Sequence, residues 1–481
     1  MSVKSPIIIW FRQDLRLTDN PALDEAVKSE RPIIPVYVLD DENAGAWKMG
    51  GASRWWLHHS LNALNHSLSG KMIFLQGDAA RVLTQLIKDT KATAVYWNRC
   101  YEPWRIDRDK KIKVDLESNG IETKSFNASL LFEPWTIKKS DGTPYRVFTP
   151  FFRRGCLSAP EPDAPRPAPQ QMYFAQNLKA DLALDQLSLL PHAPMPRWDQ
   201  KMQAYWDIGE AGAHKQLSYF LQNGLKNYKE GRNVPAQDNV SRLSPYLHFG
   251  EISPRTVWHT IKQCMIAEGL ETDGDHFLSE MGWREFSYSL LYFNRNLPLH
   301  PLQERFQLFP WDKDDDALHI WQRGQTGYPI VDAGMRELWE TGYMHNRVRM
   351  IVGSFLVKDL LLPWQYGEEW FWDCLVDADL ANNAASWQWI AGCGADAAPY
   401  FRIFNPIGQG EKFDPDGVYI RRWCPELAKL PNEWIHKPWE APPLLLKECS
   451  IVLGQNYPLP MVDHKRARDR ALLAFRATKE Q

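Results

Sequence analysis

Tryptophan is the residue type that stands out in this sequence. The 481 residues include 22 tryptophans, many of them in the C-terminal half at positions where leucine or phenylalanine would fill a core equally well. An indole ring is large and flat, so it stacks well on other rings, and it loses an electron more readily than other uncharged side chains. Trp387 and Trp389 lie two positions apart in a predicted helix, about 200° apart around its axis. The two rings must therefore face different surroundings.

Other residue patterns exclude several kinds of chemistry. The seven cysteines are scattered and form no CxxC pair, which argues against a zinc knuckle and a disulfide framework, so we expect reduced, mostly packed thiols and no metal. No GxGxxG follows an apolar run in the first 130 residues, so the usual dinucleotide fingerprint is absent. The phosphate loop that a nucleotide-dependent ligase or kinase needs is absent there as well.

Composition is that of an ordinary globular protein. The chain is 44% hydrophobic and 24% charged, and no apolar run approaches the roughly 18 residues that span a bilayer, so we expect a soluble protein. The first apolar run, residues 7–11, is followed directly by charged residues and lacks the features of a signal peptide, which favours the cytoplasm. With a net charge of −3, nucleic-acid binding would need a local cationic patch.

The elements that must position any site fall into two groups. Short apolar runs at 7–11, 32–39, 72–75 and 93–97 predict strands covered on both faces. Helical spacing at 53–68 and 78–90 lies between them. The first 130 residues therefore predict an α/β domain with a doubly wound, parallel, Rossmann-like sheet.

A proline-rich connector separates this part from a helical one. Eight prolines fall between Pro160 and Pro196, where a long helix or a central strand is improbable. Beyond them, helical spacing recurs at 210–225, 254–268, 278–293, 331–342 and 344–361. We predict an α/β domain at 1–135, a linker at 136–203 and an all-α domain at 204–481.

Several long motifs resemble those of the DNA photolyase and cryptochrome family. They are WFRQDLRLTDNPAL, SRLSPYLHFGEISPR, WREF, TGYPIVDAGMREL, MHNRVRM, DADLANNAASWQWIAGCGADAAPYFRIFNP and QGEKFDPDG. The ordered match covers essentially the whole chain outside the connector, and it is most similar to bacterial enzymes that repair cyclobutane pyrimidine dimers (CPDs). The resemblance implies an N-terminal antenna domain and a helical domain that holds FAD.

The resemblance also implies which residues bind FAD. They are Tyr228, the phosphate loop of Val240, Ser241, Arg242, Leu243 and Ser244, then Phe277, Arg284, Arg349, Asp377, Ala378, Asp379 and Asn383. Backbone N–H groups ahead of a helix suit a diphosphate, although Ser241 and Ser244 also suit helix capping, and Val240 replaces the usual threonine. Asn383 matches the residue that faces flavin N5, where a neutral amide favours the reduced anionic flavin. Arg349 and Asp377 match a pair beside the ring, or form a structural ion pair.

Further residues match the electron relay and the substrate cavity of the family. Trp387, Trp364 and Trp311 match the three tryptophans that carry an electron from the surface to the flavin. Glu280, Trp283, Asn346, Met350 and Trp389 match the cavity that receives the flipped-out dimer, and Arg232, Arg347 and Arg402 are candidates for backbone phosphates. Glu285, by contrast, is expected to be a helix-surface carboxylate.

The same cavity indicates the type of lesion. Relatives that repair (6-4) photoproducts carry two histidines on the MHNRVRM segment, whereas here only His345 is present and Met350 stands at the other position. The acid–base pair is therefore missing, and the CPD type is favoured.

The antenna chromophore is not decided by the sequence. Methenyltetrahydrofolate, a deazaflavin and an empty site all stay open. Trp104 and Arg105 stand where the folate-binding version of the family has Asn and Glu, and Arg54 with Trp55 could instead form a flat aromatic wall for a tricyclic ring.

The most favoured function is that of a deoxyribodipyrimidine photo-lyase. The resemblance implies that excited, reduced FAD passes an electron to a CPD in damaged DNA and that the cyclobutane ring then splits. We expect a monomer in the bacterial cytoplasm, on the nucleoid when bound to DNA, with no membrane and no obligate protein partner. The alternative is a cryptochrome-type blue-light photoreceptor without repair activity.

Overall fold

The computed structural model describes residues 4–176, 178, 182–192, 194–397 and 401–478. Packing divides the chain into two compact units. Unit 1 comprises Met1–Gln222 and Ser241–Phe293, and unit 2 comprises Asn223–Val240 and Asn294–Gln481. Because these units are defined by packing, the division into domains at residues 135 and 203 stays a prediction.

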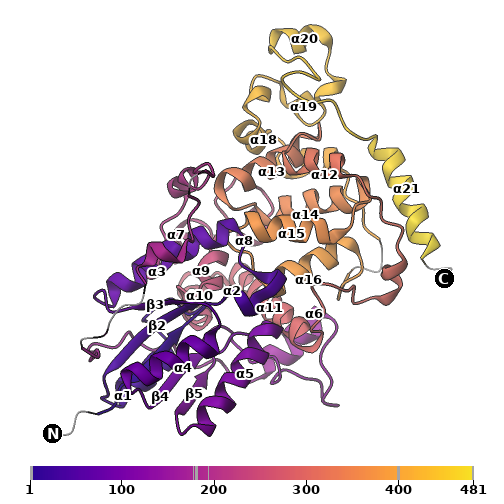
Figure 1. Ribbon diagram of the computed structural model, residues 1–481. Helices are drawn as coiled ribbons and strands as arrows, with labels where there is room; N and C mark the ends of the chain where they lie inside the picture. Colours follow the sequence, from indigo (N-terminus) through magenta and orange to yellow (C-terminus); the bar gives the residue numbers. More distant parts are fainter. Residues whose placement is uncertain (1–3, 177, 179–181, 193, 398–400, 479–481) are drawn as a thin grey trace. The chain divides into compact units, whose positions relative to one another are not determined.

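Unit 1 contains a five-stranded parallel sheet (Figure 1). Its strands are β1 (Ile7–Phe11), β2 (Ile33–Leu39), β3 (Ile73–Gln76), β4 (Ala94–Asn98) and β5 (Glu122–Phe126), in the order β3-β2-β1-β4-β5. In the central strand, Ile7 pairs with Ile33 on one side and Ala94 on the other. The four strands predicted from apolar runs are confirmed as β1 to β4. Every residue of β1, β2 and β4 is buried, and in β3 every residue except Gln76.

The fifth strand was not predicted, because its sequence ETKSF has no apolar run. β5 is an edge strand whose residues are exposed or half-buried, and it pairs with β4 from Ala94–Glu122 onward. The proline-rich connector also contacts the sheet. The N–H of Ile33 donates to Tyr173 (2.7 Å), and the N–H of Ala175 donates to Ile33 (3.0 Å).

The other regular elements in the described residues of unit 1 include ten α-helices, and the connector at 159–176 has no helix. The helices are α1 (Pro21–Lys28), α2 (Asp41–Ala44), α3 (Gly51–Ser67), α4 (Ala79–Thr90), α5 (Pro103–Ser118), α6 (Phe148–Pro150), α7 (Glu210–Asn223), α9 (Ser244–His248), α10 (Pro254–Glu268) and α11 (Glu271–Phe293). The predicted helices at 53–68 and 78–90 correspond to α3 and α4 within two residues at each end.

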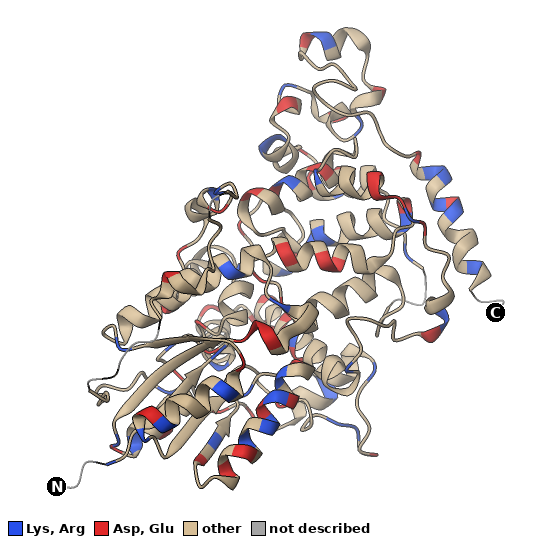
Figure 2. Cartoon of the chain, in the orientation of Figure 1, with Lys and Arg blue, Asp and Glu red and all other residues tan. Residues whose placement is uncertain are grey.

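Among the described residues of unit 2, the regular elements are helices joined by loops. Its helices are α8 (Tyr228–Gly231), α12 (Asp315–Gln322), α13 (Pro329–Thr341), α14 (Asn346–Ser354), α15 (Trp364–Cys374), α16 (Leu380–Ala391), α17 (Pro406–Phe413), α18 (Val418–Trp423), α19 (Asn432–Ile435), α20 (Pro443–Glu448) and α21 (His464–Ala477). The α/β part followed by a helical part confirms the predicted fold class. Lysines and arginines lie along α21 (Figure 2).

The predicted helix at 344–361 is interrupted. α14 ends at Ser354 and continues as a π-helical segment, Phe355–Asp359, in which the backbone spacing is wider than in an α-helix. Such segments are frequent at functional sites. Among the described residues, no helix has the length and apolar composition needed to cross a bilayer.

Candidate functional site

The side chain of Asn383 on α16 is held in one orientation. It is 8% exposed, and its Nδ2 donates to the backbone carbonyl of Glu368 on α15 (3.0 Å). Because the amide nitrogen is used in this way, Oδ1 is left as the acceptor of the amide. Glu368, which the sequence did not single out, is buried, and burial raises the pKa of its carboxyl well above the usual value, with Glu369 adding to the shift.

An ion pair lies in the same unit. Nη2 of Arg349 is 2.9 Å from Oδ2 of Asp377, and Nε donates to the carbonyl of Met344 (2.7 Å). Burial lowers the pKa of Arg349, but Asp377 more than offsets this and the net shift is upward. The arginine is therefore a permanent, half-buried cation.

The other predicted FAD residues of unit 2 have separate surroundings. Asp379 caps α16, accepting hydrogen bonds from the backbone N–H (2.9 Å) and Nδ2 (2.8 Å) of Asn382. Ala378 and Tyr228 are buried, Val240 is half-buried, and the guanidinium of Arg232 lies 5.4 Å from the Tyr228 ring centre. Arg349 offers hydrogen-bond donors and a positive charge, and Asn383 offers an acceptor, which are the group types that the edge of a flavin ring would need.

The predicted phosphate loop lies in unit 1 just ahead of α9. Oγ of Ser241 accepts from the N–H of Leu243 (3.3 Å), and Nε2 of Gln216 donates to the Ser241 carbonyl (2.8 Å). Arg242 has φ of 51°, a left-handed conformation that is uncommon for a residue with a side chain, and its guanidinium lies 4.3 Å from the Trp206 ring. Ser244 begins α9 and is exposed, with Leu243 at the N-cap.

Four predicted site residues share helix α11. Trp283 is half-buried and stacks on Phe148, with ring centres 3.8 Å apart and planes 10° apart. Phe277 is buried against Phe220 (4.9 Å), and Glu280 is half-buried. Nη1 of Arg284 donates to the Ser129 carbonyl (2.7 Å), so this predicted cofactor residue is already tied to unit 1.

The expectation for Glu285 was wrong. It is only 4% exposed, accepts a hydrogen bond from the N–H of Phe132 (3.0 Å) and lies 3.4 Å from Nη1 of Arg284. Burial raises the pKa of Glu285 to about 7, opposed by Arg284. The error arose because much of α11 is buried, so no face could be assumed to be solvated.

The three relay tryptophans belong to one hydrophobic core of unit 2. Trp364 (1% exposed) and Trp387 (3%) are buried, and Trp311 is half-buried against the same core. Trp387 makes an edge contact with Phe371 (4.9 Å), whereas Trp389 is half-buried and lines a surface pocket. The different surroundings predicted for Trp387 and Trp389 are therefore confirmed, and electron relay stays a prediction.

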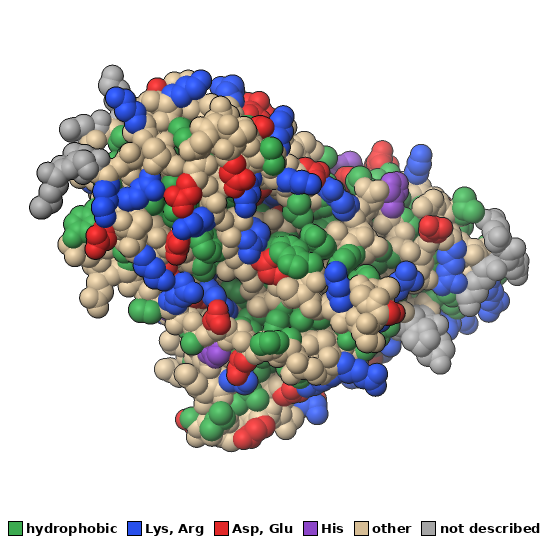
Figure 3. All heavy atoms as spheres, turned by 90° about the horizontal axis from the view of Figure 1, so that it is seen from below, with side chains coloured by type: hydrophobic (Ala, Val, Ile, Leu, Met, Phe, Trp, Pro, Cys, Tyr) green, Lys and Arg blue, Asp and Glu red, His purple; other side chains and the backbone are tan. Residues whose placement is uncertain are grey.

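The three candidate phosphate-binding arginines lie close enough to interact, and we call them the arginine cluster. The pKa of Arg347 is lowered by burial and by the positive charges of Arg232 and Arg402. Nη2 of Arg347 donates to Oδ1 of Asn233 (2.5 Å), and its guanidinium lies 4.4 Å from the ring of Phe413. Elsewhere, basic and acidic side chains are interspersed over the face in Figure 3, as the small net charge requires.

His345 caps the helix that carries Asn346, Arg347 and Met350. Its Nδ1 accepts from the N–H of Arg347 (3.1 Å), and its buried Nε2 has no hydrogen-bond partner among the described residues. Burial lowers the pKa of His345 to about 3, with the nearby arginines adding to the shift. The imidazole is therefore neutral at physiological pH. Asn346 is exposed and Met350 is half-buried.

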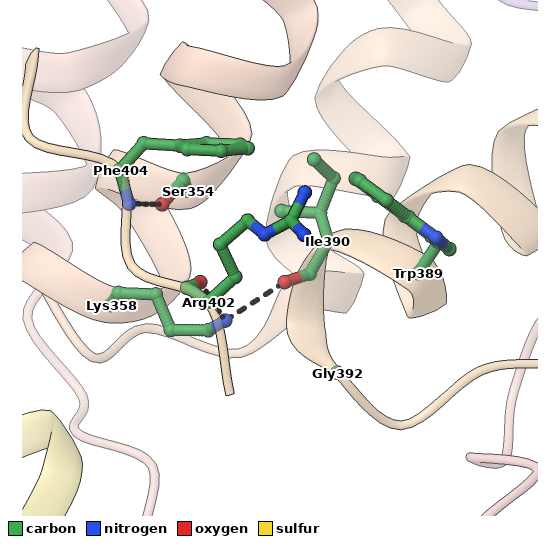
Figure 4. A pocket seen from close by; sticks show the side chains of 7 residues that line it. All are labelled: Ser354, Lys358, Trp389, Ile390, Gly392, Arg402 and Phe404. Carbon is green, nitrogen blue, oxygen red and sulfur yellow. Dashed lines mark hydrogen bonds between the residues drawn. The ribbon is translucent and has the colours of Figure 1, made fainter. Parts of the chain in front are cut away.

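A surface pocket connects two of the substrate candidates. It is lined by Ser354, Lys358, Trp389, Ile390, Gly392, Arg402 and Phe404 (Figure 4). Lys358 is 1% exposed, and the sequence did not single it out, because a lysine in a helical segment is usually solvated.

The aromatic wall proposed at Trp55 is wrong. Trp55 is 1% exposed, so it presents no open ring face, and Nη2 of Arg54 pairs with Asp41 (2.5 Å). Trp104 is half-buried, with the guanidinium groups of Arg105 and Arg108 at 4.8 and 4.9 Å from its ring centre.

Comparisons with known families match both parts of the chain. Residues 7–170 match the model described as DNA photolyase, and residues 277–477 match the FAD binding domain of DNA photolyase.

Individual relatives are similar over the whole chain. A deoxyribodipyrimidine photo-lyase of Agrobacterium fabrum is 49% identical over 100% of both chains. Cryptochrome-1 of Arabidopsis thaliana is 40% identical over 96% of this chain and 69% of its own. A crystal structure of a bacterial class III photolyase from Agrobacterium tumefaciens superposes with a TM-score of 0.95 at 48% identity, covering 99% of this chain and 98% of the other.

Proposed function

The chain belongs to the DNA photolyase and cryptochrome family, and from this premise we propose that it repairs CPDs in DNA with light. The deoxyribodipyrimidine photo-lyase of Agrobacterium fabrum supports this assignment. When bound and reduced, FAD supplies the light-excited electron that the dimer receives. The chain's own residues bind FAD and DNA, orient the dimer and discriminate between lesion types.

The observation that carries the proposal is the fixed amide of Asn383. Because Nδ2 donates to the carbonyl of Glu368 (3.0 Å), the side chain offers an acceptor and no acidic proton. Such a group would accept a hydrogen bond from the N5–H of a reduced flavin without protonating it. Arg349, a half-buried permanent cation, would stabilise the negative charge of the reduced ring. The proposed FAD set is completed by Tyr228, Val240, Ser241, Arg242, Leu243, Ser244, Phe277, Arg284, Asp377, Ala378 and Asp379.

Recognition of the lesion rests on charge and stacking. The arginine cluster would bind backbone phosphates on either side of the flipped-out dimer, a contact that fixes position without reading bases. Trp283, whose one face is covered by Phe148 at 3.8 Å, and Trp389 offer indole surfaces to the bases. Glu280 and Asn346 would read the base edges.

A neutral histidine favours CPDs over (6-4) photoproducts. His345 has its pKa lowered to about 3 and uses Nδ1 to cap α14, so it is a poor proton donor at pH 7. Splitting a cyclobutane ring needs no such donor. For the antenna site, a folate, a deazaflavin and an empty site all stay open.

The test is illumination of the FAD-loaded, reduced protein with oligothymidine that carries CPDs. We expect thymine absorbance to return under near-ultraviolet or blue light, and a (6-4) oligonucleotide to stay unrepaired. The competing function is that of a cryptochrome, to which the 40% identity with Cryptochrome-1 of Arabidopsis thaliana also points. A flavin that responds to light without any repair of either lesion would favour the cryptochrome and contradict our proposal.

A further inference from the structure

Lys358 is a buried cation whose ammonium group contacts two carbonyls and a ring rather than a carboxylate. Its Nζ donates to the backbone carbonyls of Ile390 (2.9 Å) and Arg402 (3.1 Å) and lies 3.9 Å from the centre of the Phe401 ring (Figure 4). The neighbouring Asp359 instead pairs with His464 on α21 (2.5 Å). Burial of an ammonium group is costly, so this lysine is not explained by packing alone.

The two carbonyls belong to the segments that carry two substrate candidates. Ile390 follows Trp389 in the last turn of α16, where helix carbonyls lack partners within the helix and attract a cation. Arg402 is a member of the arginine cluster. One ammonium therefore joins the end of α16 to the backbone of Arg402.

A second contact holds the same segment to the same helix. Oγ of Ser354 accepts a hydrogen bond from the N–H of Phe404 (3.1 Å), and Ser354 lies four residues before Lys358 at the point where α14 becomes π-helical. Earlier in this helix, at the same spacing of four, are Asn346 and Met350. Asn346, Met350, Ser354 and Lys358 therefore follow one another at intervals of four residues. The first two are substrate candidates, and the last two bind the Arg402 segment.

The end of α16 has other supports, whereas the Arg402 segment relies on this pair for its polar contacts. Nε2 of Gln388 donates to Leu297 (2.6 Å), and Nε2 of Gln303 donates to Gly392 (3.3 Å), so α16 is anchored independently. Among the described residues, the hydrogen bonds of residues 401–404 are those to Ser354 and Lys358. Loss of Lys358 would therefore displace Arg402 rather than unfold α16.

We propose that Lys358, supported by Ser354, is a positioning residue for damaged DNA that holds Arg402 at a fixed place beside α14 and the end of α16. This inference rests on the proposed function. Lys358 would contact neither the DNA nor the flavin. It would act through the backbone of residues that contact the DNA.

Protonation of the amine provides a readout that a purely structural residue would lack. Burial lowers the pKa of Lys358 to about 7, opposed by Cys393 and Asp359. The other charged groups at this point are His464, which pairs with Asp359, Arg470, whose Nη2 donates to the Asp359 carbonyl (2.9 Å), and the Arg402 guanidinium. A neutral amine still donates hydrogen bonds but without the strengthening that a charge provides. DNA affinity should therefore fall as the pH rises through 7.

The experiment measures Kd in the dark for a CPD-containing oligothymidine, with FAD-loaded full-length protein at pH 6 and pH 8.5. Lys358→Met should bind about tenfold more weakly at pH 6, the size of one charge-assisted hydrogen bond. Its affinity should change less with pH than that of the wild type, and repair per bound CPD after a light flash should be unchanged. Val352→Ala, in the core of the same helix against Gly334, should bind normally and controls for lost stability.

The outcomes separate this inference from the proposed function. If the wild type neither binds nor repairs CPDs, the proposed function fails. If the wild type repairs and Arg402→Ala weakens binding, but Lys358→Met binds with wild-type affinity and pH dependence, the positioning inference is overturned. Should Lys358→Met not retain FAD, Ser354→Ala takes its place. An affinity loss of about threefold is then expected, and wild-type affinity would overturn the inference.

Discussion

Much of the chemistry of this protein depends on single buried ionisable residues, and their burial is poorly predicted by sequence patterns. Glu285 and Lys358 are charged residues in helical sequences, which usually lie on the surface. Both are almost completely buried, because the helices that carry them are covered on several sides. The motifs found Asn383, Arg349 and Asp377, but burial depends on neighbours that a local pattern does not contain.

We predict that the buried carboxyl of Glu285 makes the stability of the protein depend on pH. Its pKa is raised from 4.5 to about 7, so the folded state holds the proton more tightly than the unfolded state. The free energy of unfolding should therefore fall by up to roughly 3 kcal/mol as the pH rises from 4.5 through 7. Glu285→Gln should remove this decline. Urea unfolding at pH 5 and pH 8 measures it, with the exposed Glu268→Gln as a control that keeps the wild-type dependence.

We predict that substitution of Trp364 impairs light-driven reduction of the flavin but not repair. It lies in the same buried core as Trp387 and Trp311. Trp364→Phe should slow light-driven reduction of the oxidised flavin by at least tenfold and leave repair by chemically reduced protein unchanged. Trp434→Phe, half-buried against the same core, is the control. Equal photoreduction in Trp364→Phe and the wild type would contradict the relay.

At the scale of elements, close contact between α15 and α16 sets the position of Trp387. A Cβ atom on Gly367 would lie 2.1 Å from Cη2 of Trp387, which is far inside van der Waals contact. Gly367 is therefore required where the indole crosses α15, and any side chain there would displace a predicted relay residue.

Gly367→Ala should reduce the free energy of unfolding by about 1–3 kcal/mol through overpacking and lower FAD retention. Gly408→Ala on α17 is the matched control, since its nearest heavy atom lies 4.0 Å away. Urea unfolding and the bound flavin per chain measure both effects. A Gly367→Ala protein as stable as the wild type would show that the indole has room to move.

Helices and strands were predictable wherever their burial produces a regular spacing of apolar residues in the sequence. The four buried strands and the helices α3, α4 and α10 followed from apolar spacing. β5 did not, because an edge strand with the sequence ETKSF lacks that spacing. The π-helical segment Phe355–Asp359 also has no local pattern, and it lies where α14 holds the Arg402 segment.

At the scale of the whole molecule, a chain with a net charge of −3 must bind DNA through local charge. The arginine cluster gathers three cations from segments far apart in the sequence, Arg232, Arg347 and Arg402. From the sequence, each arginine was a separate candidate for phosphate binding, and their proximity follows only from the fold. Long-range attraction of DNA to the molecule as a whole is not expected.

Salt dependence of DNA binding tests this cluster. Each phosphate contact contributes about 0.9 to the slope of log affinity against log salt for a duplex. Arg402→Gln should reduce the slope by about one contact and weaken CPD-containing and undamaged DNA alike. Arg468→Gln, exposed on the basic helix α21 and outside the cluster, should leave the slope unchanged. An unchanged slope for Arg402→Gln would remove that residue from the interface.

The central claim is that light absorbed by the flavin of this protein splits CPDs, and an action spectrum tests it most directly. The initial rate of CPD loss from oligothymidine is measured at a series of wavelengths with reduced, FAD-loaded protein and compared with its absorption spectrum. We predict that the rate follows the absorption of the bound chromophores, vanishes in the dark and is strongly reduced in Asn383→Asp. A rate that is zero at every wavelength, or that persists in the dark, would contradict the account.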